Sequence, residues 1–348
     1  MLNVGIVGCG VMGEARARAL QKMPQARLLA VTDVCRDRSE KLAARFHCAA
    51  TPDLREILFS AEVNCIIVSV PPHQHVEACL AALEAGKHVI VEKPLANSSS
   101  AAQKIVEAAQ VRGLVLATGF NYRYYPALRK ARELIAAGYI GTLDHVRSFG
   151  GHPGGDEFTH AWVHDPEVMG GGTLMDNGIH IVDLTRHFLG EVDEVVGFRT
   201  DRVWRFKGCE DNGFALLRRG DGVVATLHTS WTEWRGYRFH IEIYGTEGVL
   251  RVAYPPMRLH AYRRSLAGRK ARGKLYLFPM FQLNERLWSP RYTLVDSLIR
   301  EMIDFQRRLR RETVPAATGK DGLRAIQIVE AVYQSAAAGG TPVKLSPL

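Results

Sequence analysis

A glycine pattern near the start of the chain constrains the fold more than any other feature. The run Gly8-Cys9-Gly10-Val11-Met12-Gly13 fits G-x-G-x-x-G, follows an apolar run at Val4–Val7 and precedes an amphipathic helix. In such a unit the first glycine permits a tight turn, the second lets a pyrophosphate approach the backbone, and the third lets the helix pack on the sheet. The helix N-terminus attracts phosphate, and Asp33, 20 residues beyond Gly13, is placed to bind ribose hydroxyls. The pattern predicts a dinucleotide site formed by Gly8, Gly10, Val11, Met12, Gly13 and Asp33.

The charge of Asp33 bears on which dinucleotide binds. A carboxylate favours NAD, because the 2′-phosphate of NADP would meet a like charge. Arg36 and Arg38 follow closely and fit two interpretations, either as partners of that phosphate or as solvated residues at a helix start. We predict NAD as the cofactor, with NADP less favoured.

Apolar runs alternate with helical segments over the first 120 residues. The runs are Val4–Val7, Leu28–Thr32, Cys65–Val70, His88–Val91 and Leu114–Thr118. Short, uninterrupted apolar strands between helices are typical of a parallel sheet covered on both faces. The pattern predicts an α/β Rossmann domain with a doubly wound parallel sheet over residues 1–121.

The pattern changes after Tyr122, where alternating runs replace the continuous ones. These runs lie near 194–200, 213–218, 223–230 and 238–244. The dipeptides Asp221-Gly222 and Glu247-Gly248 stand where hairpin turns belong. Residues 122–348 are thus predicted to form an α+β domain with a large open, mostly antiparallel sheet.

Composition bounds the class of protein. The chain has 348 residues, 47% of them hydrophobic and 23% charged, which is typical of globular domains. No apolar run approaches the roughly 20 residues needed to span a bilayer, and the first strand-like run begins at Leu2, so we predict neither a membrane span nor a leader peptide. The six cysteines lack metal-type pair spacing, which indicates reduced thiols and a cytoplasmic protein.

The net charge of +9 is confined to one segment. Residues 251–292 hold ten Lys or Arg and a single acid, Glu285, so the remainder of the chain is neutral. We therefore expect neither nucleic acid nor a membrane as a partner. The segment fits two interpretations: a solvated insertion that packs at a subunit interface, or a cluster around Arg269, Lys270 and Arg272 that admits an anionic sugar derivative.

Two charges and a proline, Glu92-Lys93-Pro94, end the fourth apolar run. In doubly wound sheets the ligand crevice lies beyond the carboxyl ends of the strands. A lysine there can hold a reacting oxygen or, when desolvated, transfer a proton. Taken alone, the same residues also fit a solvated strand end.

A second candidate group follows the glycine run 170–172. A helix is expected from that run through Phe188, which would place Asp176 and His180 on one helix face. Imidazole titrates near neutral pH and suits the abstraction of a hydroxyl proton, although the pair also fits an ordinary helix histidine with a satisfied partner. Asp176, His180, Asp183 and His187 are metal-ligand types, but we predict no metal site.

Several motifs, in order, resemble the glucose–fructose oxidoreductase / inositol dehydrogenase / rhizopine catabolism (Gfo/Idh/MocA) family. They are the Gly8–Gly13 run, Ser69-Val70-Pro71-Pro72 followed by His75, Glu92-Lys93-Pro94, Gly119-Phe120-Asn121-Tyr122-Arg123, and Gly170 through Leu184. The resemblance covers residues 2 to about 250 and resumes in the final helices. It implies a Rossmann domain, an open-sheet α/β domain, nicotinamide-dependent redox chemistry on sugars or polyols, and a homodimer or homotetramer formed through that sheet.

The resemblance also implies roles for individual residues. Lys93, Asp176 and His180 would be the catalytic group, with the substrate between the domains. His180 would take the hydroxyl proton, Lys93 would polarise the oxygen, and Asp176 would orient the substrate or tune Lys93, although the proton carrier is either Lys93 or His180. Further cofactor contacts would come from Pro71, His75, Glu92 and Lys93. Substrate contacts would come from Lys93, Asn121, Arg123, Trp162, Asp176 and His180.

The predicted function is an NAD(P)-dependent oxidoreductase that transfers a hydride between a nicotinamide and a secondary alcohol or ketone of a sugar, sugar derivative or cyclitol. The chain departs from the family pattern at Val163, where the family often has Arg, and this departure leaves the identity of the substrate open. Trp231 and Trp234 are interpreted as packing residues. Two alternatives are an NAD-dependent glycosidase of the same fold and a sensor without catalysis. The presence of Lys93, Asp176 and His180 argues against the sensor.

Overall fold

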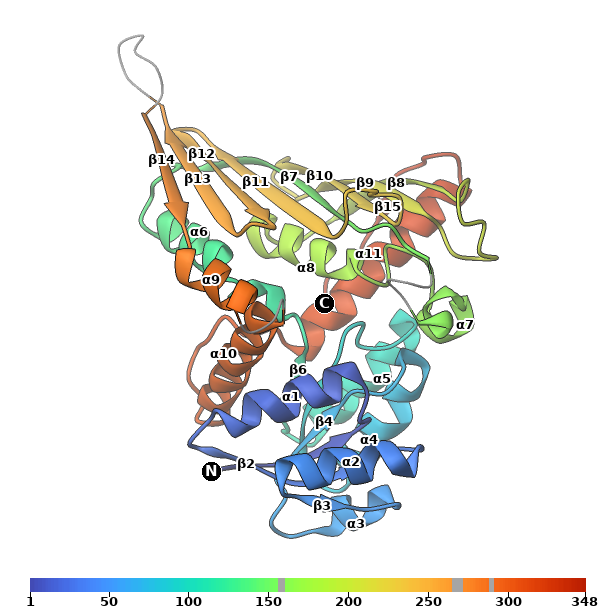
Figure 1. The fold of residues 1–348 in the computed structure, drawn as a ribbon. Coiled ribbons are helices and arrows are strands. Elements are labelled where there is room, and N and C mark those ends of the chain that lie inside the picture. The colour runs from blue at the N-terminus through green and yellow to red at the C-terminus, as the bar shows by residue number, and fades with distance from the viewer. Residues whose placement is uncertain (156–159, 265–271, 288–290) are drawn as a thin grey trace. The chain divides into compact units, whose positions relative to one another are not determined.

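The computed structural model describes residues 1–155, 160–264, 272–287 and 291–348. The chain divides into two compact units, Met1–Asn121 with Pro290–Arg324, and Tyr122–Ser289 with Ala325–Leu348. Residues 290–324 were expected with the second domain, but they cluster with the first unit because α10 (Tyr292–Leu309) packs against α1 (Val11–Gln21). Each unit is described separately below (Figure 1).

The first unit contains a parallel sheet with the strand order β3-β2-β1-β4-β5-β6. Its strands are β1 (Leu2–Val7), β2 (Ala26–Thr32), β3 (Ala49–Ala50), β4 (Cys65–Val68), β5 (His88–Val91) and β6 (Leu116–Thr118). The order reverses direction between β1 and β4, which is the topological switch point of a doubly wound sheet. The predicted Rossmann sheet is therefore confirmed, although β3 was not predicted.

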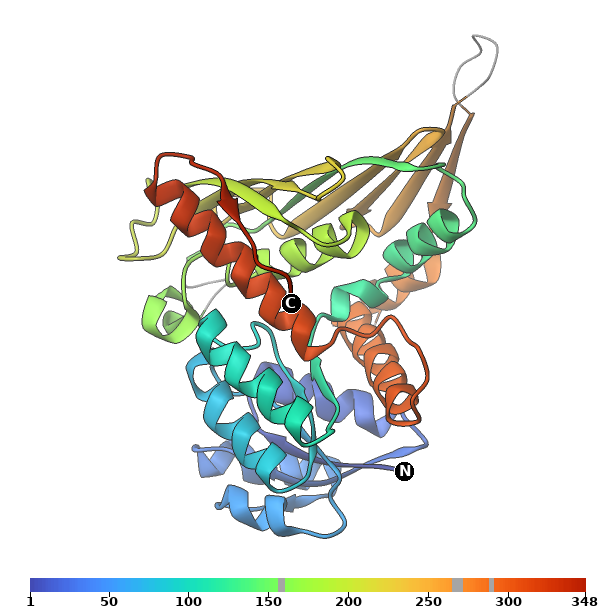
Figure 2. The ribbon, with the colours of Figure 1, turned by 180° about the vertical axis from the view of Figure 1, so that it is seen from behind.

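Helices connect these strands and cover the sheet on both faces (Figure 2). Besides α1 and α10, they are α2 (Arg36–Phe46), α3 (Leu54–Phe59), α4 (His75–Glu84), α5 (Ser99–Val111) and the short η1 (Pro72–Gln74). Ser98 caps α5 by accepting a hydrogen bond from the Ala101 backbone N–H at 3.3 Å.

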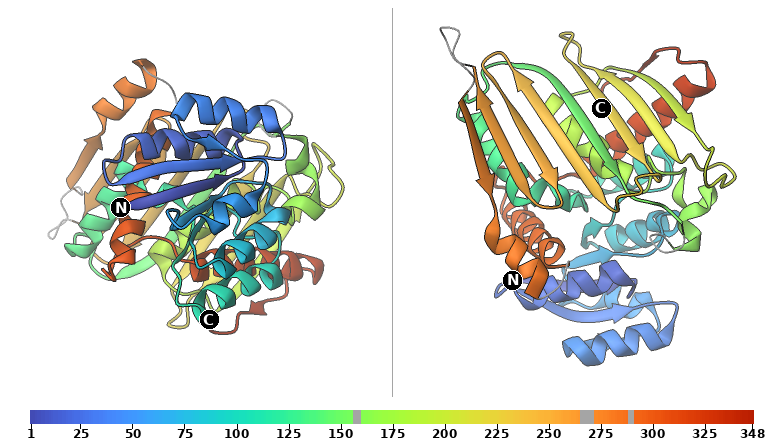
Figure 3. Two further views of the ribbon diagram at one scale, coloured as in Figure 1. Left: turned by 90° about the horizontal axis from the view of Figure 1, so that it is seen from below. Right: turned by 45° about the horizontal axis from the view of Figure 1, so that its top comes forward.

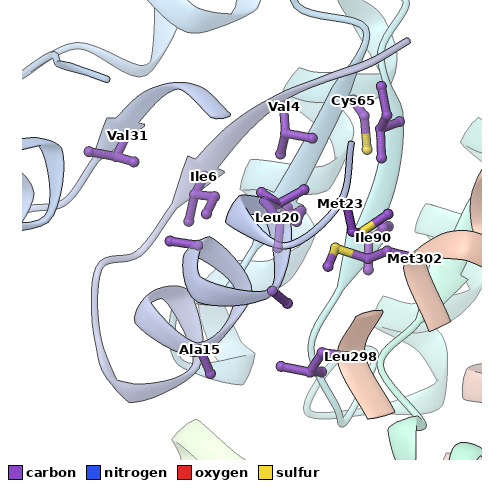
Figure 4. Close-up of a cluster of buried hydrophobic side chains, with 14 of the residues drawn as sticks. Val4, Ile6, Ala15, Leu20, Met23, Val31, Cys65, Ile90, Leu298 and Met302 are labelled. Carbon is purple, nitrogen blue, oxygen red and sulfur yellow. The ribbon is translucent and has the colours of Figure 1, made fainter. Parts of the chain in front are cut away.

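A buried apolar cluster joins α10 to the rest of the first unit. Val4 and Ile6 on β1 share this cluster with Leu20 on α1 and with Leu298 and Met302 on α10 (Figure 4). All five side chains are at most 2% exposed. Burying each contributes about 1.5–3 kcal/mol, so α10 is an integral part of this core.

The second unit is built on a sheet with the order β14-β13-β12-β11-β7-β10-β9-β8-β15 within the described residues. The strands are β7 (Leu143–Gly151), β8 (Glu194–Thr200), β9 (Asn212–Arg218), β10 (Val224–Ser230), β11 (Arg238–Gly245), β12 (Gly248–Tyr254), β13 (Arg258–Arg263), β14 (Arg272–Leu277) and β15 (Val343–Lys344). β7 and β10 run parallel, and the other pairings are antiparallel. The predicted open, mostly antiparallel sheet is confirmed.

Helices lie along one face of this sheet, and the right panel of Figure 3 views its other face, which no described helix covers. They include α6 (Pro126–Ala136), α8 (Gly178–Leu189), which packs on β7 and β10, and α11 (Gly319–Ala337), whose residues from Ala325 on belong to this unit. Shorter helices are η2 (Asn121–Tyr124), η3 (Ala161–His164), α7 (Pro166–Met169) and α9 (Pro279–Leu287).

Much of the basic segment 251–292 extends the sheet. Strands β13 and β14 form a hairpin beyond β12, and α9 follows. Arg269 and Lys270 lie outside the described residues, and the structure describes only the backbone of Arg272. No described helix is long and apolar enough to cross a membrane.

Candidate active site

The glycine turn lies between β1 and α1. Gly8 has φ +96°, and a Cβ there would come within 2.7 Å of the Ser69 backbone. A Cβ on Gly13 would lie 2.0 Å from the Gly8 carbonyl oxygen, so glycine lets α1 approach β1. Beyond the chain neighbours of Gly10, no described atom lies within 4 Å of its Cβ position. The turn is thus closed toward the sheet and open at Gly10, the N-cap of α1.

Asp33 ties the end of β2 to this turn. Its Oδ2 accepts a hydrogen bond from the Cys9 backbone N–H at 2.7 Å, and its Oδ1 accepts one from the Cys35 N–H at 2.8 Å. Burial, followed by the Asp33 charge, raises the pKa of the Cys9 thiol to about 12, so the thiol stays neutral beside the turn. The carboxylate therefore stands at the position that the fingerprint predicts.

Lys93 is half-buried at the carboxyl end of β5, and the Lys93–Pro94 peptide bond is cis. Nearby, the buried His75 imidazole has its Nδ1 2.9 Å from the Pro94 carbonyl oxygen and its Nε2 2.8 Å from that of Val70. Burial lowers the pKa of His75, which favours the neutral ring. His75 thus connects the loops that follow β4 and β5, and Pro71 precedes η1 in the first of them.

Glu92 takes part in a buried ion-pair network. Its Oε1 lies 2.7 Å from Nε of Arg16 on α1, and Arg16 also pairs with Glu301 on α10. The Arg16 side chain is fully buried, and those of Glu92 and Glu301 are 8% and 3% exposed. The network joins the glycine-turn helix, the strand that carries Lys93, and α10.

The prediction that Asp176 lies on a helix is wrong, because α8 begins at Gly178 with Asn177 as its N-cap. The backbone before α8 is held in turns by Glu210, whose carboxylate accepts hydrogen bonds from the N–H groups of Gly172 (3.0 Å) and Leu174 (2.8 Å). Asp176 and His180 consequently flank the start of α8 instead of sharing a helix face.

The Asp176 carboxylate lies among buried aromatic and imidazole groups. Its Oδ2 accepts a hydrogen bond from Trp231 Nε1 at 3.2 Å and lies 3.3 Å from His152 Nε2. Its side chain is 15% exposed, whereas Trp231 is fully buried. Trp231, predicted to be a packing residue, therefore also orients this carboxylate.

The His180 imidazole is stacked on Tyr122, with ring centroids 3.9 Å apart and planes 3° from parallel. The Tyr122 hydroxyl lies 3.2 Å from Asn177 Oδ1 and accepts a hydrogen bond from the Tyr237 hydroxyl at 2.5 Å. Burial raises the pKa of both tyrosines, so they remain protonated. The stack and this hydroxyl chain fix the ring plane of His180 at the first turn of α8.

Arg123 forms a buried pair with Asp183 on α8, with its Nε 2.8 Å from Asp183 Oδ2. This pair braces η2, and with it Tyr122, against α8. In the first unit, Asn121 Nδ2 donates a hydrogen bond to Ser297 Oγ on α10 at 2.7 Å. Trp162, on η3, is 37% exposed.

The structure gathers these residues into two groups. In the first unit, the glycine turn, Asp33, His75, Glu92 and Lys93 lie at the carboxyl ends of the parallel strands. In the second unit, Asp176 and His180 flank the start of α8. Among the described residues there is no cluster of three or more His, Cys, Asp and Glu side chains able to hold a metal ion.

Sequence reasoning missed Glu210 and His152, and it did not recognise that Tyr122 stacks on His180. Tyr122 lies within a motif already noted, so a role beside its neighbours Asn121 and Arg123 was within reach. In the sequence Glu210 is only a polar residue before a strand. No sequence pattern indicates that its carboxylate accepts a hydrogen bond from Gly172, 38 residues earlier.

A Rossmann sheet with an open glycine turn, joined to an open antiparallel sheet, defines a dinucleotide-binding oxidoreductase architecture. Two family models match: "Oxidoreductase family, NAD-binding Rossmann fold" over residues 2–120 and "GFO/IDH/MocA C-terminal domain" over residues 128–251. The chain belongs to the Gfo/Idh/MocA family of oxidoreductases.

Curated relatives support this over most of the chain. Levoglucosan dehydrogenase from Pseudarthrobacter phenanthrenivorans is 28% identical, over 97% of this chain and 96% of its own length. A dTDP-3,4-didehydro-2,6-dideoxy-alpha-D-glucose 3-reductase from Streptomyces antibioticus is 31% identical, over 75% of this chain and 79% of its own length. The solved structure of levoglucosan dehydrogenase in complex with NADH and L-sorbose has a TM-score of 0.88 at 25% identity, covering 100% of this chain and 99% of that one.

Proposed function

We propose that this enzyme transfers a hydride between NAD and a secondary alcohol or ketone of a sugar, sugar derivative or cyclitol. The observation that carries the proposal is the oriented acid–base pair at the start of α8, in which Trp231 holds Asp176 and Tyr122 stacks on His180. The relatives that act on levoglucosan, inositol and a nucleotide-linked deoxysugar support carbohydrates and cyclitols as the substrate class.

The first unit fits NAD at its glycine turn. The open space at Gly10 leaves room for a pyrophosphate on the N-terminus of α1, and the Asp33 carboxylate stands ready for ribose hydroxyls. Bound NAD supplies the carbon that accepts the hydride. The proposed contacts are Gly8, Gly10, Val11, Met12, Gly13, Asp33, Pro71, His75, Glu92 and Lys93.

The proposed catalytic group is Lys93, Asp176 and His180. His180 takes the proton from the reacting hydroxyl, Lys93 holds and polarises the same oxygen, and Asp176 orients the substrate. Asn121, Arg123 and Trp162 complete the proposed substrate-binding set. Arg123 contributes by holding η2 and Tyr122 against α8.

A substrate panel tests the reaction. Sugars, polyols and cyclitols are incubated with NAD or NADP, and reduced cofactor is followed by its absorbance. We expect turnover of at least one secondary alcohol and a higher kcat/KM with NAD. A chromogenic glycoside hydrolysed without net NADH would indicate the glycosidase instead, and cofactor binding without any turnover would indicate a sensor.

Substitutions test the catalytic group. Lys93→Ala and His180→Ala should each lower kcat by about 10²–10⁴ while leaving the melting temperature near that of the wild type. His187→Ala, further along α8, is the matched control and should keep its turnover. Near-wild-type kcat in both catalytic variants would refute the assignment, and the pH profiles of the two variants show which residue carries the proton.

We further propose a homodimer or homotetramer formed through the open face of the sheet in the second unit. Exposed apolar side chains gather there on β8, β9 and β10, including Phe198 (54% exposed), Leu216 (52%) and Val224 (42%). Sedimentation should show an oligomer that Leu216→Asp dissociates, and a monomeric wild type would refute the proposal.

The six free cysteines support a cytoplasmic location.

A further inference from the structure

Two tryptophans of the second unit form an aromatic surface, Trp204 in the loop after β8 and Trp234 in the loop after β10. Trp204 and Trp234 have ring centroids 6.1 Å apart, and Phe206 lies parallel to Trp204 at the same separation, with planes 2° apart. Trp234 is 63% exposed, although indole rings usually bury most of their area. We call Trp204, Phe206 and Trp234 the aromatic platform.

The position of Trp204 is fixed by several independent contacts. The backbone N–H groups of Val203 and Trp204 donate hydrogen bonds to Asp211 Oδ2, at 2.6 and 3.2 Å. A Cβ on Gly154 or on Gly155 would come within 2.6 or 2.8 Å of the indole ring, so the glycine backbone lies flat against it. These contacts fix the position of the Trp204 ring within the platform.

The platform is linked to the proposed catalytic carboxylate through a single residue. Trp204 Nε1 donates a hydrogen bond to the Trp231 carbonyl oxygen at 2.9 Å, and Trp231 Nε1 donates one to Asp176 Oδ2 at 3.2 Å. Trp231 therefore spans the distance from Asp176 to the platform. Two hydrogen bonds through Trp231 therefore connect the platform to Asp176.

The chemistry of the platform suits a sugar ring. The face of an indole carries partial negative charge, which attracts the partly positive C–H groups on the apolar face of a pyranose. Beside Trp234, Glu233 and Arg235 form an ion pair at 2.7 Å, and Arg238 lies 3.7 Å from the same carboxylate. Such groups can exchange hydrogen bonds with the hydroxyls at the rim of the ring.

We propose that the aromatic platform is a second sugar subsite, which stacks a further pyranose ring joined by a glycosidic bond to the ring that is oxidised. The preferred substrate is then a disaccharide or a longer glycoside. This inference rests on the proposed function, because it names the substrate class of the same site.

Matched pairs of probes test the subsite. The first pair is methyl β-glucoside and cellobiose, and the second is methyl α-glucoside and maltose; each pair differs by one pyranose ring. The variants are Trp234→Ala, which removes the exposed ring, and Trp234→Phe, which keeps an aromatic face. Phe59→Ala, at a 79% exposed position of the first unit, is the control.

In Trp234→Ala we expect kcat/KM for the disaccharide to fall about tenfold, with the methyl glucoside unchanged. Trp234→Phe should recover most of the loss, and Phe59→Ala should behave as the wild type. An equal loss for both members of a pair indicates a structural role and overturns the proposal, as does no loss for either.

Calorimetric titration separates failure of the subsite from failure of the proposed reaction. If no probe is oxidised, the redox proposal fails for these sugars, but disaccharide binding to the NAD-loaded protein still reports on the platform. A tenfold weaker affinity in Trp234→Ala than in the wild type supports the subsite. Absence of disaccharide binding to the wild type, or equal affinity in the two proteins, overturns it.

Discussion

Replacing Arg16 by Met isolates the energetic role of the buried network that supports the cofactor turn. Arg16 is fully buried and faces two carboxylates, Glu92 and Glu301, whose side chains are 8% and 3% exposed. Methionine preserves much of the volume but removes the positive charge, so two buried carboxylates would remain without a counter-ion. Breaking a buried pair in this way costs about 3–5 kcal/mol, and for a unit of this size each kcal/mol lowers Tm by about 2–4 °C.

The neighbouring ion pair on the same helix provides the control. Arg18 lies 2.6 Å from Glu14, about as close as Arg16 is to Glu92, but the two side chains are 40% and 27% exposed. Solvent screens such a pair, so Arg18→Met should cost about 0.5 kcal/mol or less. With the distances nearly equal, burial decides which substitution matters.

Thermal and urea unfolding followed by circular dichroism measure the effect. We expect Arg16→Met to lower Tm by about 6–20 °C at neutral pH. The triple variant Arg16→Met, Glu92→Gln, Glu301→Gln should recover much of the loss. An Arg16→Met protein as stable as Arg18→Met, at neutral pH, would refute the reasoning.

Three further substitutions probe the site. Glu210→Gln places an amide N–H₂ against backbone donors, so we expect a loss of about 1–3 kcal/mol in urea unfolding and a lower kcat/KM. Because burial raises the pKa of Glu210, wild-type stability should decline as the pH rises above the ordinary carboxyl range, and Glu210→Gln should lack that decline; parallel pH profiles would contradict this. Tyr122→Leu removes the stacked ring and should lower kcat about tenfold and shift its pH profile, whereas Tyr122→Phe should retain most activity; equal kcat in the two variants would contradict the stacking role. Asp33→Asn should narrow the NAD preference in kcat/KM, and an unchanged ratio would show that Asp33 does not select the cofactor.

The Rossmann half of the fold was predictable because local signals agree with one another. The Gly8–Gly13 run and the apolar strands both depend on short stretches of sequence. The open sheet followed from its alternating runs. By contrast, α10 returns to the first unit through contacts with α1, and no local pattern reports which core an amphipathic helix will join.

The start of α8 shows why the site was harder to predict than the fold. Spacing alone suggested that Asp176 and His180 share a helix face, since residues four apart do so in a helix. In the structure the backbone N–H groups of Gly172 and Leu174 donate hydrogen bonds to the Glu210 carboxylate, and the helix begins only at Gly178. Periodicity cannot reveal a hydrogen bond between segments that lie far apart in the sequence, such as Gly172 and Glu210.

Three loops of the structure use a carboxylate in the same way. Asp33 accepts hydrogen bonds from the backbone at the glycine turn, Glu210 from the backbone before α8, and Asp211 from the backbone of Trp204. A loop lacks the repeating hydrogen bonds of a helix or a strand, so its N–H groups need other acceptors when they are buried. A carboxylate can accept several N–H groups at once, and these bonds are stronger than neutral ones. The glycine turn, the backbone before α8 and the backbone of Trp204 are therefore each held by one acidic side chain.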